Sequence, residues 1–87
     1  KEIDFSEARL RQLGSYLLEK KKTSEAMAVL ELNAEAFPKS ARAREELGDA
    51  LLAAGRRKEA AEAFRKALTL KPGSGKLKKK LAKSEEP

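Results

Sequence analysis

The sequence contains no cysteine, no histidine and no tryptophan, and aromatic residues make up only 5% of it. Without cysteine the chain forms no disulfide and no thiolate metal site, so the redox state of its compartment stays open. Without histidine it lacks the side chain that most often serves as general base or metal ligand near neutral pH. We therefore expect no enzymatic activity, no metal and no cofactor in this chain.

Long apolar runs and nucleotide-binding motifs are also missing. No stretch approaches the roughly 18 apolar residues of a membrane-spanning helix, so we expect no membrane span. Gly73-Ser74-Gly75-Lys76 is similar to part of a phosphate loop, but it lacks the upstream glycine and a preceding strand. The carboxylates of Glu45, Glu46 and Asp49 share neighbouring helix positions, and we interpret them as solvated charges rather than as a cation site.

Charge is abundant and unevenly placed. Charged residues make up 39% of the chain, and the net charge is +6. The excess lies near the C-terminus, in a block that contains no acid: Lys71, Lys76, Lys78, Lys79, Lys80 and Lys83. One interpretation is a solvated face that caps the fold. The other is an anionic-surface or nucleic-acid binder, which is disfavoured because no arginine or aromatic residue is interleaved to stack on bases.

Apolar residues recur with helical spacing, and Pro, Gly and Ser separate them into five segments. We predict helices over residues 6–20, 24–36, 41–54, 57–70 and 75–83, with a frayed end over 84–87. Asp4 with Glu7 predicts a capping box for the first helix, and Ser40 and Ser74 are predicted caps of later helices. The first turn places Lys21 where the second has Gly55, and a lysine in a left-handed conformation costs roughly 1 kcal/mol. The first turn should be the weaker one.

The chain repeats itself at an offset of 34 residues, as Leu13-Gly14 and Leu47-Gly48 show. A period of 34 is typical of the tetratricopeptide repeat, and the chain resembles that family over residues 7–74. The repeat signature consists of Leu13, Gly14, Ala26, Pro38, Leu47, Gly48, Ala60, Phe64 and Pro72. The resemblance implies an all-α, right-handed α-solenoid. Its divisions are a lead-in over 1–6, repeats over 7–40 and 41–74, and a basic capping helix with a tail over 75–87.

The resemblance also implies a function, because members of this family are mostly protein- and peptide-binding scaffolds. Their ligand usually lies on the concave face formed by the first helix of each repeat. Carried over by repeat position, that face consists of Arg11, Ser15, Leu18, Arg42, Glu45, Asp49, Leu52, Lys76 and Lys80. One subset of the family clamps the C-terminal carboxylate of chaperones. That activity is disfavoured here, because Glu46 stands at a position where those members carry asparagine, and its charge repels a carboxylate.

A narrower resemblance covers residues 30–52. The string Leu30-Glu31-Leu32-Asn33, followed by Glu35, Pro38, Ser40 and Leu47-Gly48, is similar to the C-terminal repeats of bacterial serine hydrolases of the β-lactamase/esterase type. It implies an appendage of a larger bacterial protein, and a hydrolase tail could be periplasmic. If the module is instead free-standing, we expect it to be cytoplasmic. The alternative is that Asn33 merely hydrogen-bonds in the turn between repeats.

Self-association is the second functional hypothesis. Two repeats leave apolar ends uncovered, and stacking against another copy would cover them. The residues predicted at these ends are Phe5, Leu10, Tyr16 and Phe37. The expected partners are therefore a protein or peptide ligand, or a second copy of the chain.

Overall fold

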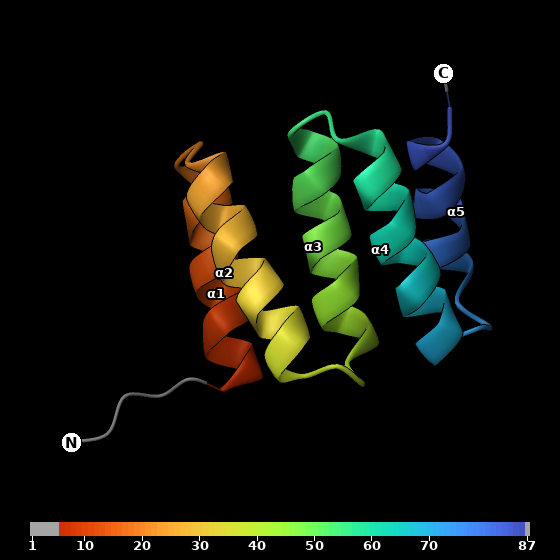
Figure 1. Cartoon of the computed structure of the whole chain (residues 1–87), viewed down its shortest axis with the longest axis horizontal. Coiled ribbons are helices and arrows are strands. Elements are labelled where there is room, and N and C mark those ends of the chain that lie inside the picture. The colour runs from red at the N-terminus through yellow and green to blue at the C-terminus, as the bar shows by residue number, and fades with distance from the viewer. Residues whose placement is uncertain (1–5, 87) are drawn as a thin grey trace.

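A computed structural model describes residues 6–86, which fold into helices without any strand. The helices stand side by side in chain order (Figure 1). Their bounds are α1 Glu7–Glu19, α2 Thr23–Ala36, α3 Ala41–Ala53, α4 Arg57–Leu70 and α5 Gly75–Ser84. No helix among these is long and apolar enough to span a bilayer.

Neighbouring helices pack as two hairpins followed by a single helix. α1 packs on α2, α3 packs on α4, and α2 joins the hairpins by packing on α3. α5 lies against α4 at the opposite end from α1 (Figure 1). The predicted all-α repeat fold is confirmed.

Glycines inside α1 and α3 let each hairpin close tightly. A Cβ atom added to Gly14 would lie 2.5 Å from Cδ2 of Leu30, and one added to Gly48 would lie 2.5 Å from Cε1 of Phe64. Leu30 and Phe64 are almost fully buried in consequence. The large side chain of the second helix therefore packs directly on the backbone of the first, in both repeats.

The two hairpin turns use the same backbone conformation with different residues. Lys21 has φ of 62° and Gly55 has φ of 81°, so both lie in the left-handed region. Glycine has no Cβ to clash there, whereas lysine does. The prediction that Lys21 occupies the costlier geometry is confirmed.

Serine side chains cap three of the helices. The Oγ atoms of Ser6, Ser40 and Ser74 each accept a hydrogen bond from the backbone N–H three residues on, at 3.3, 3.1 and 3.2 Å. The caps predicted at Ser40 and Ser74 are confirmed. The predicted cap of the first helix is wrong, because Ser6 holds that position; Asp4 lies outside the described residues.

The C-terminal end is more ordered than the sequence suggested. α5 continues to Ser84, which is 3% exposed and whose hydroxyl donates a hydrogen bond of 2.7 Å to the carbonyl of Leu81. The prediction that residue 84 belongs to a frayed end is wrong. A hydroxyl that bonds its own helix turn needs no solvent, so a serine can lie buried at a helix end.

Burial on the first hairpin also differs from the sequence pattern. Leu10 is buried, although it was predicted at an exposed apolar end, and Phe37 is half-buried. Phe5 lies outside the described residues. Leu13 is 46% exposed and Ala8 is exposed too, although both follow the helical spacing of apolar residues in α1. Periodicity identifies an apolar stripe, but the packing of neighbours decides how much of it is covered.

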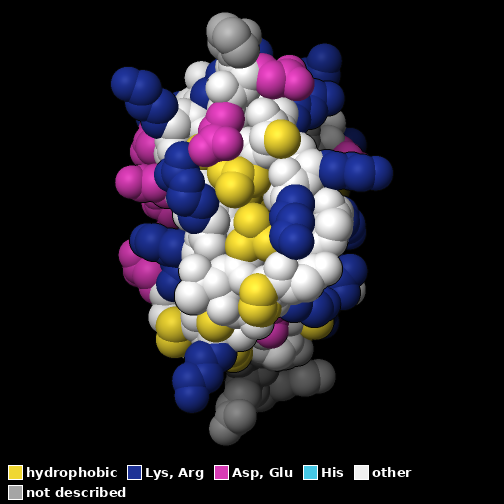
Figure 2. All heavy atoms as spheres, turned by 90° about the vertical axis from the view of Figure 1, so that its right-hand side faces the viewer, with side chains coloured by type: hydrophobic (Ala, Val, Ile, Leu, Met, Phe, Trp, Pro, Cys, Tyr) yellow, Lys and Arg dark blue, Asp and Glu magenta, His cyan; other side chains and the backbone are white. Residues whose placement is uncertain are grey.

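Figure 2 shows the end of the molecule formed by α5. Hydrophobic side chains run down its centre, with Lys and Arg on both sides. Leu77 lies beneath this surface, 2% exposed, while Leu81 is partly buried against the core. The outer face is therefore a mixed surface rather than a continuous basic one.

Candidate functional site

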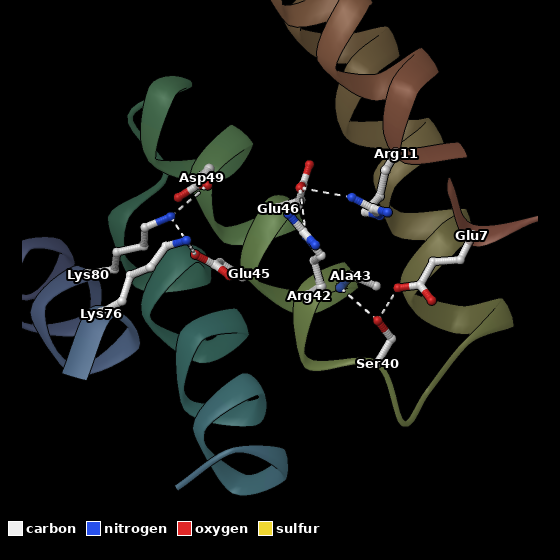
Figure 3. Close-up of polar contacts among 10 residues, drawn as sticks. All are labelled: Glu7, Arg11, Ser40, Arg42, Ala43, Glu45, Glu46, Asp49, Lys76 and Lys80. Atoms are coloured by element: carbon white, nitrogen blue, oxygen red, sulfur yellow. Dashed lines mark hydrogen bonds and ion pairs between the residues drawn. The ribbon is translucent and has the colours of Figure 1, made fainter. Parts of the chain in front are cut away.

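Charged side chains of α1, α3 and α5 meet across one surface of the molecule (Figure 3). They come from the first helix of each hairpin and from the last helix, which are separated along the chain by α2 and α4. Every second helix along the chain therefore contributes charged side chains to this surface. The charged residues that meet here are Arg11, Arg42, Glu45, Glu46, Asp49, Lys76 and Lys80.

Lys80 is the centre of the contacts between α3 and α5. Its Nζ atom lies 2.7 Å from Oε2 of Glu45 and 3.0 Å from Oδ2 of Asp49. The Nζ atom of Lys76 lies 3.4 Å from the same Glu45 oxygen. Two lysines on α5 therefore neutralise two carboxylates on α3, one helical turn apart.

Burial and neighbouring charges shift the pKa values of Glu45 and Lys80. Burial by itself would raise the pKa of Glu45, but hydrogen bonds and charges from Lys80 and Lys76 outweigh it, and the pKa lies below its ordinary value of 4.5. Burial would lower the pKa of Lys80, but the hydrogen bonds that it donates to Glu45 and Asp49 raise the pKa above 10.5. Both groups are therefore ionised across the whole neutral range.

A second group of charges joins α1 to α3. Oε2 of Glu46 lies 3.8 Å from Nη1 of Arg11 and 3.9 Å from Nε of Arg42. Nearby, Ser40 donates a hydrogen bond to Glu7 while it caps α3 (Figure 3). The first helix of each hairpin is thus connected to its counterpart by polar contacts.

The remaining predicted groove residues contribute less charge. Ser15 is exposed on α1, and Leu18 and Leu52 are partly buried against the core. Glu46 was not among the predicted groove residues, yet it pairs with Arg11 and Arg42. The sequence carries a signal for it, since Arg42 and Glu46 are four residues apart on one helix and attract each other.

This arrangement suits exchange of ion pairs with a charged ligand. The carboxylates are paired with lysine and arginine, and no group of three or more acidic residues within 6–86 is placed to hold a metal ion.

Asn33, which the sequence linked to the inter-repeat turn, is fully buried, and its side-chain atoms have no hydrogen-bond partner. The predicted side-chain hydrogen bond of Asn33 is therefore wrong.

Comparison with known proteins agrees with the repeat pattern. A profile of the family described as "Tetratricopeptide repeat" matches residues 11–75. No curated protein matches the chain, and the resemblance to serine-hydrolase tails stays a prediction.

Solved structures of similar fold bear the name MamA. The structure titled "MamA MSR-1 C2" superposes with a TM-score of 0.79 at 34% identity, covering 92% of this chain and 46% of that one. The structure titled "MamA AMB-1 C2221" has a TM-score of 0.77 at 36% identity, covering 86% and 44%. The chain spans less than half the length of these proteins. With the paired hairpins and the recurring glycines, the profile match over most of the sequence shows that the chain belongs to the tetratricopeptide repeat family.

Proposed function

We propose that the chain is a non-catalytic module that binds a protein or peptide on the surface shared by α1, α3 and α5. Membership of the family supports a protein-binding module in general. The observation that carries the finer proposal is the row of charges from Arg11 to Lys80, contributed by every first helix of the repeat. Side chains with opposite charges on neighbouring helices can align an extended segment of matching polarity.

Two partly exposed leucines also support the proposal that this surface binds a ligand. Leu18 and Leu52 occupy equivalent repeat positions on α1 and α3 and are only partly covered. Partly exposed leucines next to fixed charges give a ligand both apolar area to bury and directional contacts. Fold alone does not choose the ligand, so the side chains on this surface must set specificity.

The test is peptide selection followed by charge reversal. A library of random displayed peptides is selected against the purified chain, and binding of the recovered peptides is measured by fluorescence polarisation. We expect the double variant Arg42→Glu with Lys76→Glu to lose binding. Both side chains are mostly exposed, at 67% and 69%, so the fold should survive the change. Lys80 is less suitable for reversal, because a glutamate there would face Glu45 and Asp49.

The matched control is Lys58→Glu with Lys78→Glu, which changes the net charge equally at exposed positions. Full binding by the control and none by the first variant, with both circular dichroism spectra unchanged, is the expected result. Equal retention of binding by both variants would rule out the surface of α1, α3 and α5 as the docking site.

A second copy of the chain is the alternative partner, and one observation favours it. Leu47 and Ala50 are 9% and 0% exposed on α3, which packs against both α2 and α4. The same repeat positions on α1 hold Leu13 and Tyr16, which are 46% and 54% exposed. Apolar area of this kind is often the surface through which subunits associate.

Sedimentation velocity over a range of concentrations tests self-association. A mass that rises with concentration in the wild type and stays monomeric in Leu13→Lys would support the second-copy hypothesis. Strictly monomeric behaviour of the wild type at high concentration would exclude it.

A further inference from the structure

The lysines at the C-terminal end of the chain fall into two groups, according to the carboxylates near them. Lys76 and Lys80 form ion pairs with Glu45, and Lys80 also pairs with Asp49. The second group makes no ion pair within residues 6–86. Its members are Lys71, in the loop before α5, and Lys78, Lys79 and Lys83 on α5. Positive charge at this end of the molecule is therefore only partly neutralised.

Helical geometry places most of the second group on the side of α5 that faces away from α4. Leu77 and Ser84 are buried, and they lie seven residues apart along the side that packs on α4. The exposed residues on the opposite side form the outer face of α5: Lys78, Lys79, Ala82 and Lys83. Ala82 follows Lys78 and Lys79 by one turn, so it lies between the two cations.

No carboxylate of the neighbouring chain neutralises this outer face. α5 itself contains no acid, and the Glu85 that follows it lies 2.7 Å from Nη2 of Arg65 on α4. Lys79 and Lys83 are four residues apart on one helix, so they repel each other. A helix that accumulates like charges departs from local preference, and such departures concentrate at functional sites.

The outer face of α5 suits a broad anionic surface better than a ligand that needs a groove. The two cavities beside α5 are lined by other residues, among them Lys76 on one side and Ser84 on the other. Figure 2 shows Lys and Arg side chains on both sides of a row of hydrophobic side chains. Lysine carries a point charge on a flexible stem and attracts anions without a fixed geometry. Clusters of lysine on an amphipathic helix are typical of binding to anionic lipids.

We propose that the outer face of α5 adsorbs to a membrane surface that carries anionic lipid headgroups. Lysine side chains lay their aliphatic stems along apolar surface while their ammonium groups stay in water, which is the arrangement at a lipid headgroup layer. Ala82 and the hydrophobic row in Figure 2 supply the apolar surface between them. A nucleic acid is disfavoured, because the outer face contains no aromatic side chain that could stack on a base.

Membrane contact through this face leaves the proposed ligand surface open. Lys76 and Lys80 point from α5 towards α3 (Figure 3) and are not part of the outer face. α1 lies at the opposite end of the row of helices (Figure 1). The module would therefore stand on the lipid with α5 at its base, and its surface of α1, α3 and α5 would remain accessible from the side.

Co-sedimentation of the whole chain with vesicles tests the proposal. The vesicles contain either phosphatidylcholine alone or phosphatidylcholine with roughly one third phosphatidylserine. We expect binding to the second kind only, and weaker binding as salt screens the charges. The triple variant Lys78→Gln, Lys79→Gln and Lys83→Gln should bind roughly a hundredfold more weakly, because each lysine near an anionic bilayer contributes about fivefold.

The matched control removes three exposed lysines from the turn between α1 and α2, far from α5 (Figure 1). It combines Lys20→Gln, Lys21→Gln and Lys22→Gln, so it changes the net charge equally. The control should bind the phosphatidylserine vesicles nearly as well as the wild type. All the substituted side chains are exposed, so the circular dichroism spectra should not change.

A further variant, Ala82→Leu, separates a lipid surface from other anionic partners. Added apolar area at an exposed position gains contact only when the partner has an apolar layer beneath its charges. We expect severalfold tighter binding of Ala82→Leu to the phosphatidylserine vesicles. Its binding to a single-stranded oligodeoxynucleotide should equal that of the wild type.

Four outcomes would overturn the inference. They are no binding of the wild type to phosphatidylserine vesicles, equal weakening by the two triple variants, no gain from Ala82→Leu, and release of the chain from vesicles by the oligodeoxynucleotide. None of these outcomes bears on peptide binding at the surface of α1, α3 and α5, because Arg42, Lys76 and Lys80 are unchanged in every variant.

Discussion

At the scale of single residues, two glycines set the spacing of the hairpins. Gly48 lies under the ring of Phe64, and an added Cβ atom would come within 2.5 Å of it. An aromatic ring held at 0% exposure has little freedom to retreat. We therefore expect the hairpin to resist any side chain at this position.

The variant Gly48→Ala should lower the free energy of unfolding by about 1–3 kcal/mol through overpacking, despite the higher helix propensity of alanine. Gly75→Ala is the matched control, because an added Cβ atom there has nothing within 4 Å. Urea unfolding of both variants checks the prediction. Equal stability of the two would mean that Phe64 can move aside.

A single buried amide is the clearest defect in the core. Asn33 is fully buried with neither side-chain atom bonded, and the same repeat position in α4 is Ala67. An unsatisfied buried amide costs roughly 1–3 kcal/mol, so an apolar residue of similar volume should relieve it. We expect Asn33→Leu to raise the thermal midpoint by several degrees, measured by circular dichroism. A lower midpoint would show that the amide has a partner in solution.

At the scale of elements, ion pairs connect helices that are not neighbours in the hairpins. Lys80 on α5 forms ion pairs with Glu45 and Asp49 on α3. Arg11 on α1 forms an ion pair with Glu46, which also lies on α3. The side chains of Glu45 and Lys80 are 15% and 28% exposed, so solvent screens this pair less than a fully exposed one. The positions of α1, α3 and α5 relative to one another therefore depend on charge as well as on apolar packing.

A double-mutant cycle of Glu45→Gln and Lys80→Gln should give a coupling energy of about 1 kcal/mol. The pKa of Glu45 is lowered, so its contribution is complete above pH 4.5 and is lost as the pH falls through the lowered value. The pKa of Lys80 is raised, so its contribution is complete below pH 10.5 and is lost as the pH rises beyond it.

Stability measured against pH checks the sign of this effect. The difference between wild type and the double variant should be flat at neutral pH and shrink at both extremes. A difference that grows at low pH would contradict the assignment of the pair.

At the scale of the whole molecule, every helix depends on its neighbours for burial. α5 has a single fully buried leucine, Leu77, which joins the core cluster with Ala67 and Phe64 of α4. In a repeat protein each unit contributes through its interface with the next, so a weak last helix weakens the whole domain.

We expect Leu77→Ala to cost about 2–5 kcal/mol, as other deletions of a buried leucine do. Such a loss is a large part of the stability of a small domain, so the thermal midpoint should fall by more than about 10 °C. Lys79→Ala is the control, since its side chain is exposed. A midpoint unchanged by Leu77→Ala, with α3 and α4 intact, would show that α5 folds as an independent appendage.

Helix positions were predictable from the sequence, because apolar period, serine caps and prolines are local signals that tertiary contacts did not override. The segments predicted over 41–54 and 57–70 correspond to α3 and α4 within one residue. The degree to which individual side chains are exposed was less predictable. Leu13 and Leu47 share a repeat position, yet one is exposed and one is buried, because α3 packs between α2 and α4 whereas α1 stands at the end of the row.

The sequence by itself determined the fold, since a period of 34 with small residues at fixed places specifies paired helices whatever surrounds them. It also determined which residue types reach the surface of α1, α3 and α5. Only the tertiary structure decided how those charges combine: Lys80 binds two carboxylates, while Arg11 and Arg42 share Glu46. The reason is distance, because ion pairs act over a few ångströms, and residues about thirty positions apart reach that range only when the helices pack.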